Sequence, residues 1–453
     1  MATTVQALVD RGRHFISRDA VFTRVLKHSG WMASANFITM GLAFVQGLII
    51  ARVFGPEQLG VVALVTVYAS TVNQFVDSRV WEAAIKYVIH YREQGNLARA
   101  QATVKLCYLV DAATGVVAFA VVVLTAGFAA RLLVKDAQIT GLIQFYALSV
   151  LLGIPGGTSS ALLRIGGRFD QIAYQDIAVA MIRLACVIAV ALLGLGIRGL
   201  LGVYLVTTAT GAFALLYLSG KTNRQLNLGS WWRTPLRVLS GEYRRILSFM
   251  LHTNLTGTSR LITSKADTLI LGGLANPTAV GLYKLAKTIT DPLMALVGPA
   301  YTAVYPALSG LVAQGDFRRV RSLQRKLSAT IAAVVFPVCL VFMVVVTWAI
   351  PFLFGQKFQA SVPLAQIVVW QVIWTPMLWV PGLLLSMERA RLLAGMNWLD
   401  ALIYVAFLLV LVSSFGVLGA AIATLLRFIV STLLLALAGA HANRQLQFQE
   451  ASP

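Results

Sequence analysis

The chain has 453 residues, of which 58% are hydrophobic and only 12% are charged, and its mean hydropathy is +0.78. These values exclude an ordinary water-soluble domain, in which about a quarter of the residues are charged, and indicate an integral membrane protein. The formal net charge of +20 does not by itself indicate nucleic-acid binding, because membrane proteins concentrate Lys and Arg in their cytoplasmic loops.

Apolar runs recur along the chain, each close to the roughly 20 residues that cross a hydrocarbon core about 30 Å thick. Because unpaired backbone groups are costly in lipid, each run is expected to be a helix. The pattern predicts an all-α integral membrane protein with about 12 transmembrane helices. The expected spans are 30–53, 57–82, 103–129, 139–163, 170–195, 198–220, 247–275, 277–312, 328–354, 361–387, 393–413 and 416–440.

Polar segments flank these spans and divide them into two halves. Residues 1–29 are basic and are expected to lie on the membrane surface. They contain no apolar core of the signal-peptide type, so no cleavage is expected. Residues 221–246 form the longest polar segment and are expected to link an N-lobe at 30–220 to a C-lobe at 247–440. A cytoplasmic tail is expected at 441–453.

The distribution of Lys and Arg predicts the orientation in the membrane. With both termini placed in the cytoplasm, the inner segments hold 25 of the 37 Lys and Arg residues. The outer loops then hold only Arg52, Arg131, Lys135, Arg198 and Lys357. Since cytoplasmic loops carry an excess of positive charge, both termini are expected in the cytoplasm. Most of the net charge therefore reflects topology, and no nucleic-acid partner is expected.

An internal repeat relates the two halves. It pairs FGPEQLGVVAL at 54–64 with ANPTAVGLYKL at 275–285, and QGNLAR at 94–99 with QGDFRR at 314–319. Pro56 thereby aligns with Pro277, and Gly60 with Gly281. Since both halves begin with the same orientation, the repeat is parallel, about an axis along the membrane normal. It predicts two pseudo-symmetric six-helix lobes around a central cavity.

Charged residues interrupt the expected spans of the second half. Lys284, Lys287 and Asp291 share a narrow arc of one helix, and Arg260 and Asp267 share a polar face of the span before it. Each such charge costs a few kcal/mol or more at the bilayer centre, so it is expected to face a wet cavity or a partner. We interpret the charges as the wall of a lumen that attracts a phosphate or diphosphate. Structural ion pairs, such as Lys287 with Asp291, are the alternative interpretation.

The chain carries no recognisable catalytic or nucleotide-binding motif. It has no Walker loop, no HExxH, no GxSxG and no paired acidic residues on a loop for a metal-bound sugar nucleotide. Cys107, Cys186 and Cys339 fall on separate spans with no paired spacing, which is typical of packing residues. The sequence therefore predicts a protein that is not an enzyme and holds no cofactor or metal.

The first two spans, ANFITMGLAFVQGLIIARVFGPEQLGVVALVTVYAS, and the charged QGN loop after them resemble a known family. They are similar to the polysaccharide biosynthesis proteins of the multidrug/oligosaccharidyl-lipid/polysaccharide (MOP) superfamily, the Wzx-type oligosaccharide flippases of bacteria. The resemblance is closest over 30–105 and returns at 275–326. It implies two six-helix lobes that surround a V-shaped cavity and alternate between inward-open and outward-open states.

The resemblance also implies a function, a location and partners. The implied cargo is a polyprenyl-diphosphate-linked glycan, such as an O-antigen, capsule or exopolysaccharide repeat unit, carried from the cytoplasmic to the periplasmic leaflet. The implied location is the bacterial inner membrane, beside a glycan polymerase and export machinery. Arg260, Lys284 and Lys287 are then the candidate substrate-binding residues, with Arg79 as a counterpart in the first half.

Asp77, Asp267 and Asp291 are candidates for coupling transport to H⁺ or Na⁺, because a carboxylate can exchange a cation during a transport cycle. Neutralising nearby lysines is the alternative role for these carboxylates.

Two other functions remain open from the sequence. A drug or cation exporter of the same superfamily would share the architecture but would favour a more acidic lumen. A membrane glycan polymerase or ligase would place its reactive groups on a large external loop, whereas the outer loops here are short.

Overall fold

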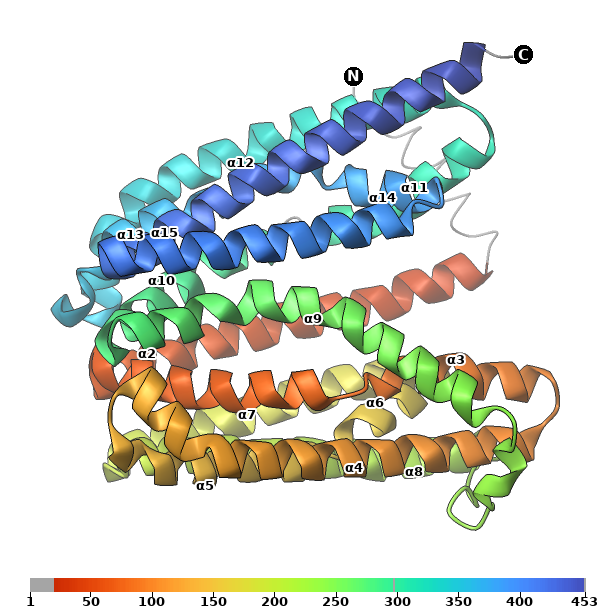
Figure 1. Cartoon of the computed structure of the whole chain (residues 1–453), viewed down its shortest axis with the longest axis horizontal. Helices are drawn as coiled ribbons and strands as arrows, with labels where there is room; N and C mark the ends of the chain where they lie inside the picture. Colours follow the sequence, from red (N-terminus) through yellow and green to blue (C-terminus); the bar gives the residue numbers. More distant parts are fainter. Residues whose placement is uncertain (1–19, 296–297, 452–453) are drawn as a thin grey trace.

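The computed structural model describes residues 20–295 and 298–451, which form helices and no strand. In chain order the α-helices are α2 (Ala20–Val76), α3 (Val80–Glu93), α4 (Leu97–Ala129), α5 (Thr140–Gly153), α6 (Gly156–Ile165), α7 (Phe169–Leu193), α8 (Gly196–Gln225), α9 (Tyr243–Leu274), α10 (Pro277–Ala295), α11 (Gly298–Ala313), α12 (Phe317–Phe354), α13 (Ser361–Val368), α14 (Trp379–Ser386) and α15 (Ala390–Ala451) (Figure 1). Shorter turns are η1 (Ala130–Val134), η2 (Ala137–Ile139), η3 (Leu236–Leu239), η4 (Gln356–Phe358) and η5 (Val369–Met377).

Two of the long helices bend at a glycine. Gly55 has φ 73° and ψ 178° within α2, and Gly416 has φ 55° and ψ −130° within α15. These positive φ values suit a residue without a Cβ. Pro56 follows the first bend and is well placed to begin a helix, because its missing N–H would be unpaired there anyway. The bends fall where the sequence predicts one span to end and the next to begin.

Eight stretches of the described chain are long and apolar enough to cross a membrane. Two of them, Gly30–Glu93 and Ala390–Gln445, each contain two of the predicted spans. The predicted spans 247–275 and 277–312 are not among the eight. They correspond to α9 and to α10 with α11, the helices that carry the charged residues of the second half.

The helices are arranged as two lobes (Figure 1). Helices α2 to α8 form one lobe, α10 to α15 form the other, and α9 runs from the first lobe to the second. The lobes meet at one end, where α2 and α10 cross, and diverge toward the end that holds the C-terminus. The all-α, two-lobe architecture predicted from the sequence is thus confirmed. Of the predicted N-terminal segment at 1–29, residues 1–19 lie outside the described residues, and the rest is the first part of α2.

Hydrophobic packing explains why the two ends of the molecule differ. At the end where the lobes meet, one core contains residues of both lobes, including Leu64, Val280 and Phe354. Toward the other end the cores are separate, one built on α3, α4 and α6, the other on α11, α12, α14 and α15. The start of α9 belongs to the first of these, because Ile246 and Met250 are buried in it. The first turns of the predicted C-lobe thus pack on the first lobe.

The repeated Pro and Gly residues meet each other where α2 and α10 cross. A Cβ on Gly60 would lie 1.7 Å from the carbonyl oxygen of Pro277, and a Cβ on Gly281 would lie 1.8 Å from that of Pro56. Only glycine allows backbones to approach so closely. The contact is reciprocal, so the two copies of the repeat are related here by local two-fold symmetry.

Candidate functional site

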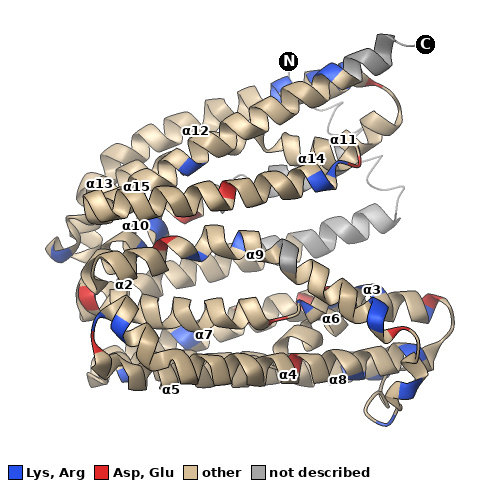
Figure 2. Cartoon of the chain, in the orientation of Figure 1, with Lys and Arg blue, Asp and Glu red and all other residues tan. Residues whose placement is uncertain are grey.

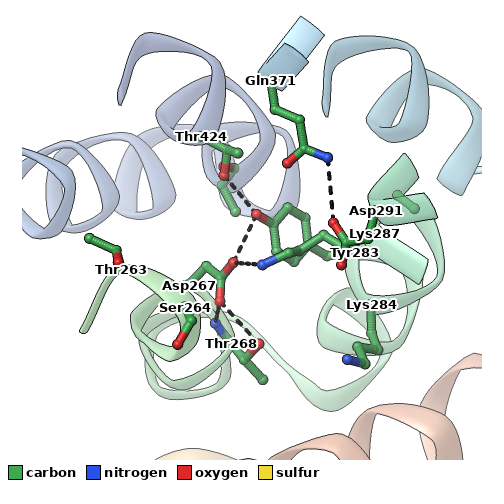
Figure 3. Close-up of polar contacts among 12 residues, drawn as sticks. Thr263, Ser264, Asp267, Thr268, Tyr283, Lys284, Lys287, Asp291, Gln371 and Thr424 are labelled. Carbon is green, nitrogen blue, oxygen red and sulfur yellow. Dashed lines mark hydrogen bonds and ion pairs between the residues drawn. The ribbon is translucent and has the colours of Figure 1, made fainter. Parts of the chain in front are cut away.

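A buried polar network lies in the second lobe, between α9, α10 and α15 (Figure 3). Asp267 of α9 is fully buried, and Nζ of Lys287 donates to its Oδ2 over 2.6 Å. The hydroxyls of Tyr283 and Tyr404 donate to the same oxygen over 3.2 and 3.3 Å. Oγ1 of Thr424 lies 2.7 and 3.0 Å from the two phenol oxygens. The network thus fixes one lysine and one carboxylate within the lobe.

The partner of Lys287 is therefore on the preceding helix. Asp291, which lies one turn along α10, is exposed and accepts a hydrogen bond from Nε2 of Gln371 over 3.4 Å. The side chain of Lys287 keeps 20% of its surface exposed, whereas that of Asp267 keeps none. The spacing of Lys287 and Asp291 suggested a pair within one helix, but the interhelical pair with Asp267 is the one that forms.

Two of the candidate cations stay outside this network. Lys284 and Arg260 are exposed, and no carboxylate within the described residues forms an ion pair with either. Figure 3 shows no contact that joins the Lys284 side chain to the Asp267 network. Lys265 of α9 is close enough to Lys284 to interact with it electrostatically. Three lysines thus gather near two carboxylates, Asp267 and Asp291, which leaves an excess of positive charge that can attract an anion.

A second ion pair joins two parts of α15 in the same lobe, and sequence reasoning assigned it no role. Nε of Arg427 donates to Oδ2 of Asp400 over 3.0 Å, and Ser431 donates to Oδ1 over 2.9 Å. The guanidinium also donates to the carbonyl oxygen of Thr263 over 3.2 Å, which ties α15 to α9. Its central carbon lies 4.9 Å from the centre of the Tyr404 ring. The pair therefore supports the helices that hold Asp267.

Asp77 and Arg79 lie at a break between α2 and α3, in the first lobe. Arg79 has φ 46°, and its backbone N–H donates to Oδ1 of Asp77 over 3.1 Å. Its guanidinium forms an ion pair with Glu82, one turn along α3. It also lies against Gly257 of α9, where a Cβ would come within 2.5 Å of Nη1. Arg79 thus joins the first lobe to α9, and its charge is paired with Glu82.

Asp111 is a functional candidate that the sequence analysis missed. Oδ2 of this carboxylate accepts hydrogen bonds from the hydroxyl and, over 3.1 Å, the backbone N–H of Thr158 at the start of α6. It lines a cavity with Asp77. The signal was present, since Asp111 is the lone charged residue in the apolar run 106–130.

Comparison with known proteins identifies the family. A family described as "Polysaccharide biosynthesis protein" matches residues 49–363. The chain belongs to this family. Among relatives of this polysaccharide biosynthesis protein, the lipopolysaccharide biosynthesis protein WzxC of Escherichia coli is 21% identical over 91% of the chain and 80% of WzxC. An uncharacterised membrane protein in the cps region of Klebsiella pneumoniae is 22% identical over 91% of the chain and 81% of that protein.

Solved structures establish the fold. An inward-facing multidrug resistance MATE transporter of the MOP superfamily has a TM-score of 0.76 at 13% identity, over 92% of this chain and 96% of that one. The lipid II flippase MurJ in an inward closed conformation has a TM-score of 0.68 at 13% identity, over 92% of this chain and 90% of MurJ. An outward-facing MATE transporter has a lower TM-score, 0.62, at 14% identity, over 93% of this chain and 96% of that one. The polysaccharide biosynthesis protein is thus a multi-pass membrane protein with a transporter fold, not an enzyme.

Proposed function

We propose that the protein flips a polyprenyl-diphosphate-linked oligosaccharide, such as an O-antigen, capsule or exopolysaccharide repeat unit, across the bacterial inner membrane by alternating access. The names of two relatives, one in lipopolysaccharide biosynthesis and one from a cps region, support a glycan cargo. The MOP fold supports transport between two lobes.

The observation that carries the proposal is the excess of cations in the second lobe. Asp267 neutralises Lys287, but Lys284 and Arg260 are exposed without an ion pair among the described residues. A diphosphate would supply the missing negative charge, and both Lys and Arg form strong charge-assisted hydrogen bonds with its oxygens. A cationic drug would be repelled by the same groups.

The distribution of charge supports a cytoplasmic location for both termini. Lys and Arg gather toward the end of the molecule that holds the C-terminus and α3, with fewer at the opposite end (Figure 2). The end where the hydrophobic cores are separate would then face the cytoplasm. A cargo assembled on the cytoplasmic leaflet would enter between the lobes from that side.

Coupling of transport to H⁺ or Na⁺ is part of the proposal. Among the three candidate carboxylates, Asp291 suits exchange with a cation best, because it is exposed and, within the described residues, is held only by the Gln371 contact of 3.4 Å. Asp267 is occupied by Lys287, and Asp77 accepts the N–H of Arg79. A dependence of flipping on an imposed H⁺ or Na⁺ gradient that disappears in Asp291→Asn would support this assignment.

The test is to delete the gene, extract the membranes and identify accumulated lipid-linked oligosaccharides by mass spectrometry. Wild type is expected to clear the accumulated lipid. The rate of clearance by Lys284→Ala is expected to be at least about tenfold lower. Lys357→Ala is the matched control, because Lys357 is an exposed lysine in η4 that takes no part in the cluster. If no lipid-linked glycan accumulates and sensitivity to cationic compounds rises instead, the protein is an exporter and the proposal is wrong.

A further inference from the structure

A cavity of about 350 Å³ lies inside the first lobe, where two of its spans are broken. One break separates α2 from α3 at Asp77 to Arg79, and the other separates α5 from α6 at Ile154 and Pro155. Residues beside both breaks line the cavity. Breaks in the spans of transporters are where polar groups are exposed to a substrate, because the freed backbone is tolerated only beside protein or water.

Two carboxylates line the cavity, and each is anchored by one oxygen. Oδ2 of Asp111 accepts both hydrogen bonds from Thr158, and Oδ1 of Asp77 accepts the N–H of Arg79. Within the described residues, the other oxygen of each carboxylate accepts no hydrogen bond. Asn73 and Thr208 add further polar groups to the wall. The wall therefore offers fixed acceptors for hydroxyl donors.

Aromatic rings complete the lining. Trp81 and Tyr146 face the cavity, and 37% of the surface of Trp81 is exposed. The guanidinium carbons of Arg79 and Arg164 lie 5.9 and 5.7 Å from the centre of the Trp81 ring, which fixes its position by cation–π contacts. A fixed aromatic face beside carboxylate and amide acceptors suits a sugar, whose C–H face packs on the ring while its hydroxyls donate to the acceptors.

We propose that this cavity is the glycan subsite of the transporter and takes an uncharged sugar residue of the cargo. The inference rests on the proposed function and divides the cargo between the lobes. Asp77 and Asp111 repel a diphosphate, which the cations of the second lobe attract. The volume lies at the lower end of the roughly 300–1,000 Å³ of small-molecule sites. It far exceeds the space of a single cation, whose oxygen ligands lie about 2.0–2.6 Å away.

Binding of two probes to the full-length protein in nanodiscs separates the subsite from the proposed function. One probe is the lipid-linked oligosaccharide purified from the deletion strain, and the other is undecaprenyl diphosphate without sugars. Trp81→Ala and Asp111→Asn are expected to weaken binding of the first about 3- to 10-fold and to leave binding of the second unchanged. Lys284→Ala is expected to weaken binding of both.

Trp348→Ala is the matched control, because Trp348 is 65% exposed on α12 and lies outside the cavity. Tyr146→Phe provides a milder variant that keeps the ring, and it is expected to reduce only glycan binding. If the cavity variants weaken both probes equally or neither, the glycan subsite is wrong although the transporter proposal stands. If wild type binds neither probe, the proposed function fails, and the subsite with it.

Discussion

Asp267 is fully buried between α9, α10 and α15, yet both of its carboxylate oxygens accept hydrogen bonds. Besides Lys287 and the two phenols, the backbone N–H of Thr268 donates to Oδ1 over 2.6 Å. Desolvation makes a buried ion pair a weak source of stability, but removing one partner leaves an uncompensated charge. Lys287 therefore has a structural role, because it compensates the buried charge of Asp267. This role is separate from any contact that Lys287 makes with a cargo.

Asp267→Asn is expected to destabilise the protein by about 3 kcal/mol, the lower end for breaking a buried pair, because Lys287 keeps 20% exposure. The measurement is chemical or thermal unfolding of the purified protein in detergent. Adding Lys287→Met should restore part of the loss, since the double variant has no unpaired charge. Asp291→Asn serves as the control and should stay within about 0.5 kcal/mol of wild type. Wild-type stability of Asp267→Asn would contradict the role given to the pair.

Which charges belong together could be predicted only in part. The face shared by Lys284 and Lys287 follows from helical periodicity, which is local. The partner of Lys287 depends on how α9 packs on α10, and the position of Lys265 beside Lys284 depends on the same packing. Asp111 shows the same limit, since its partner Thr158 lies 47 residues away in the chain.

The crossing of α2 and α10 joins the lobes through backbone atoms rather than through long side chains. Gly60 and Gly281 each face a carbonyl oxygen of the opposite helix, so the contact has no side chain that could move aside. Phe44 of α2 and Phe354 of α12 also pack edge-to-face between the lobes, with their ring centres 6.0 Å apart. The two lobes thus share a rigid contact about which they can rotate.

Gly60→Ala and Gly281→Ala are each expected to lower stability by about 1–3 kcal/mol and to reduce flipping, because the added methyl group overlaps a carbonyl oxygen. The measurements are the unfolding midpoint and the clearance of accumulated lipid-linked oligosaccharide. Gly41→Ala on α2 is the control, since a Cβ there meets no atom within 4 Å. Equal behaviour of all three variants would mean that the helices can separate without loss.

The bends at Gly55 and Gly416 could be predicted because glycine and proline act on their own stretch of backbone. The breaks after Val76 and Gly153 lie inside the expected spans 57–82 and 139–163, so the prediction of unbroken spans is wrong there. Pro155 at the second break is a local signal of the same kind, whereas the first break has no Gly or Pro, and there Arg79 adopts φ 46° and donates to Asp77. The missed breaks are also the ones that line the cavity of the first lobe.

Closure of one end of the molecule depends on contacts that cross between the lobes. Arg52, just before the bend in α2, donates to the carbonyl oxygens of Leu353 and Phe352 over 2.5 and 2.7 Å. Lys135, which follows η1, donates to the carbonyl oxygen of Ala275 over 2.9 Å. The first pair joins a cation to the C-terminal end of α12, where the helix dipole favours positive charge. In the proposed alternating-access cycle, an outward-open state requires these hydrogen bonds to break.

The double variant Arg52→Ala/Lys135→Ala is therefore expected to open this end of the molecule more often. At about 1 kcal/mol for each hydrogen bond, losing three shifts the equilibrium about 100-fold toward the outward-open state. Spin labels at Gln138→Cys and Gln356→Cys, in a protein whose three native cysteines are replaced, report the distance between the lobes. Both positions are exposed beside the two contacts.

A longer and broader distance distribution in the double variant would show that the cations hold this end closed. Arg131→Ala/Arg198→Ala is the matched control, because these exposed outer arginines donate no interlobe hydrogen bond within the described residues. If removal of charge alone opened this end, the distance would change in both double variants. If loss of the carbonyl contacts opens it, the distance changes only in Arg52→Ala/Lys135→Ala. An unchanged distribution would assign closure to the shared hydrophobic core instead, since Leu64, Val280 and Phe354 remain packed across the lobes.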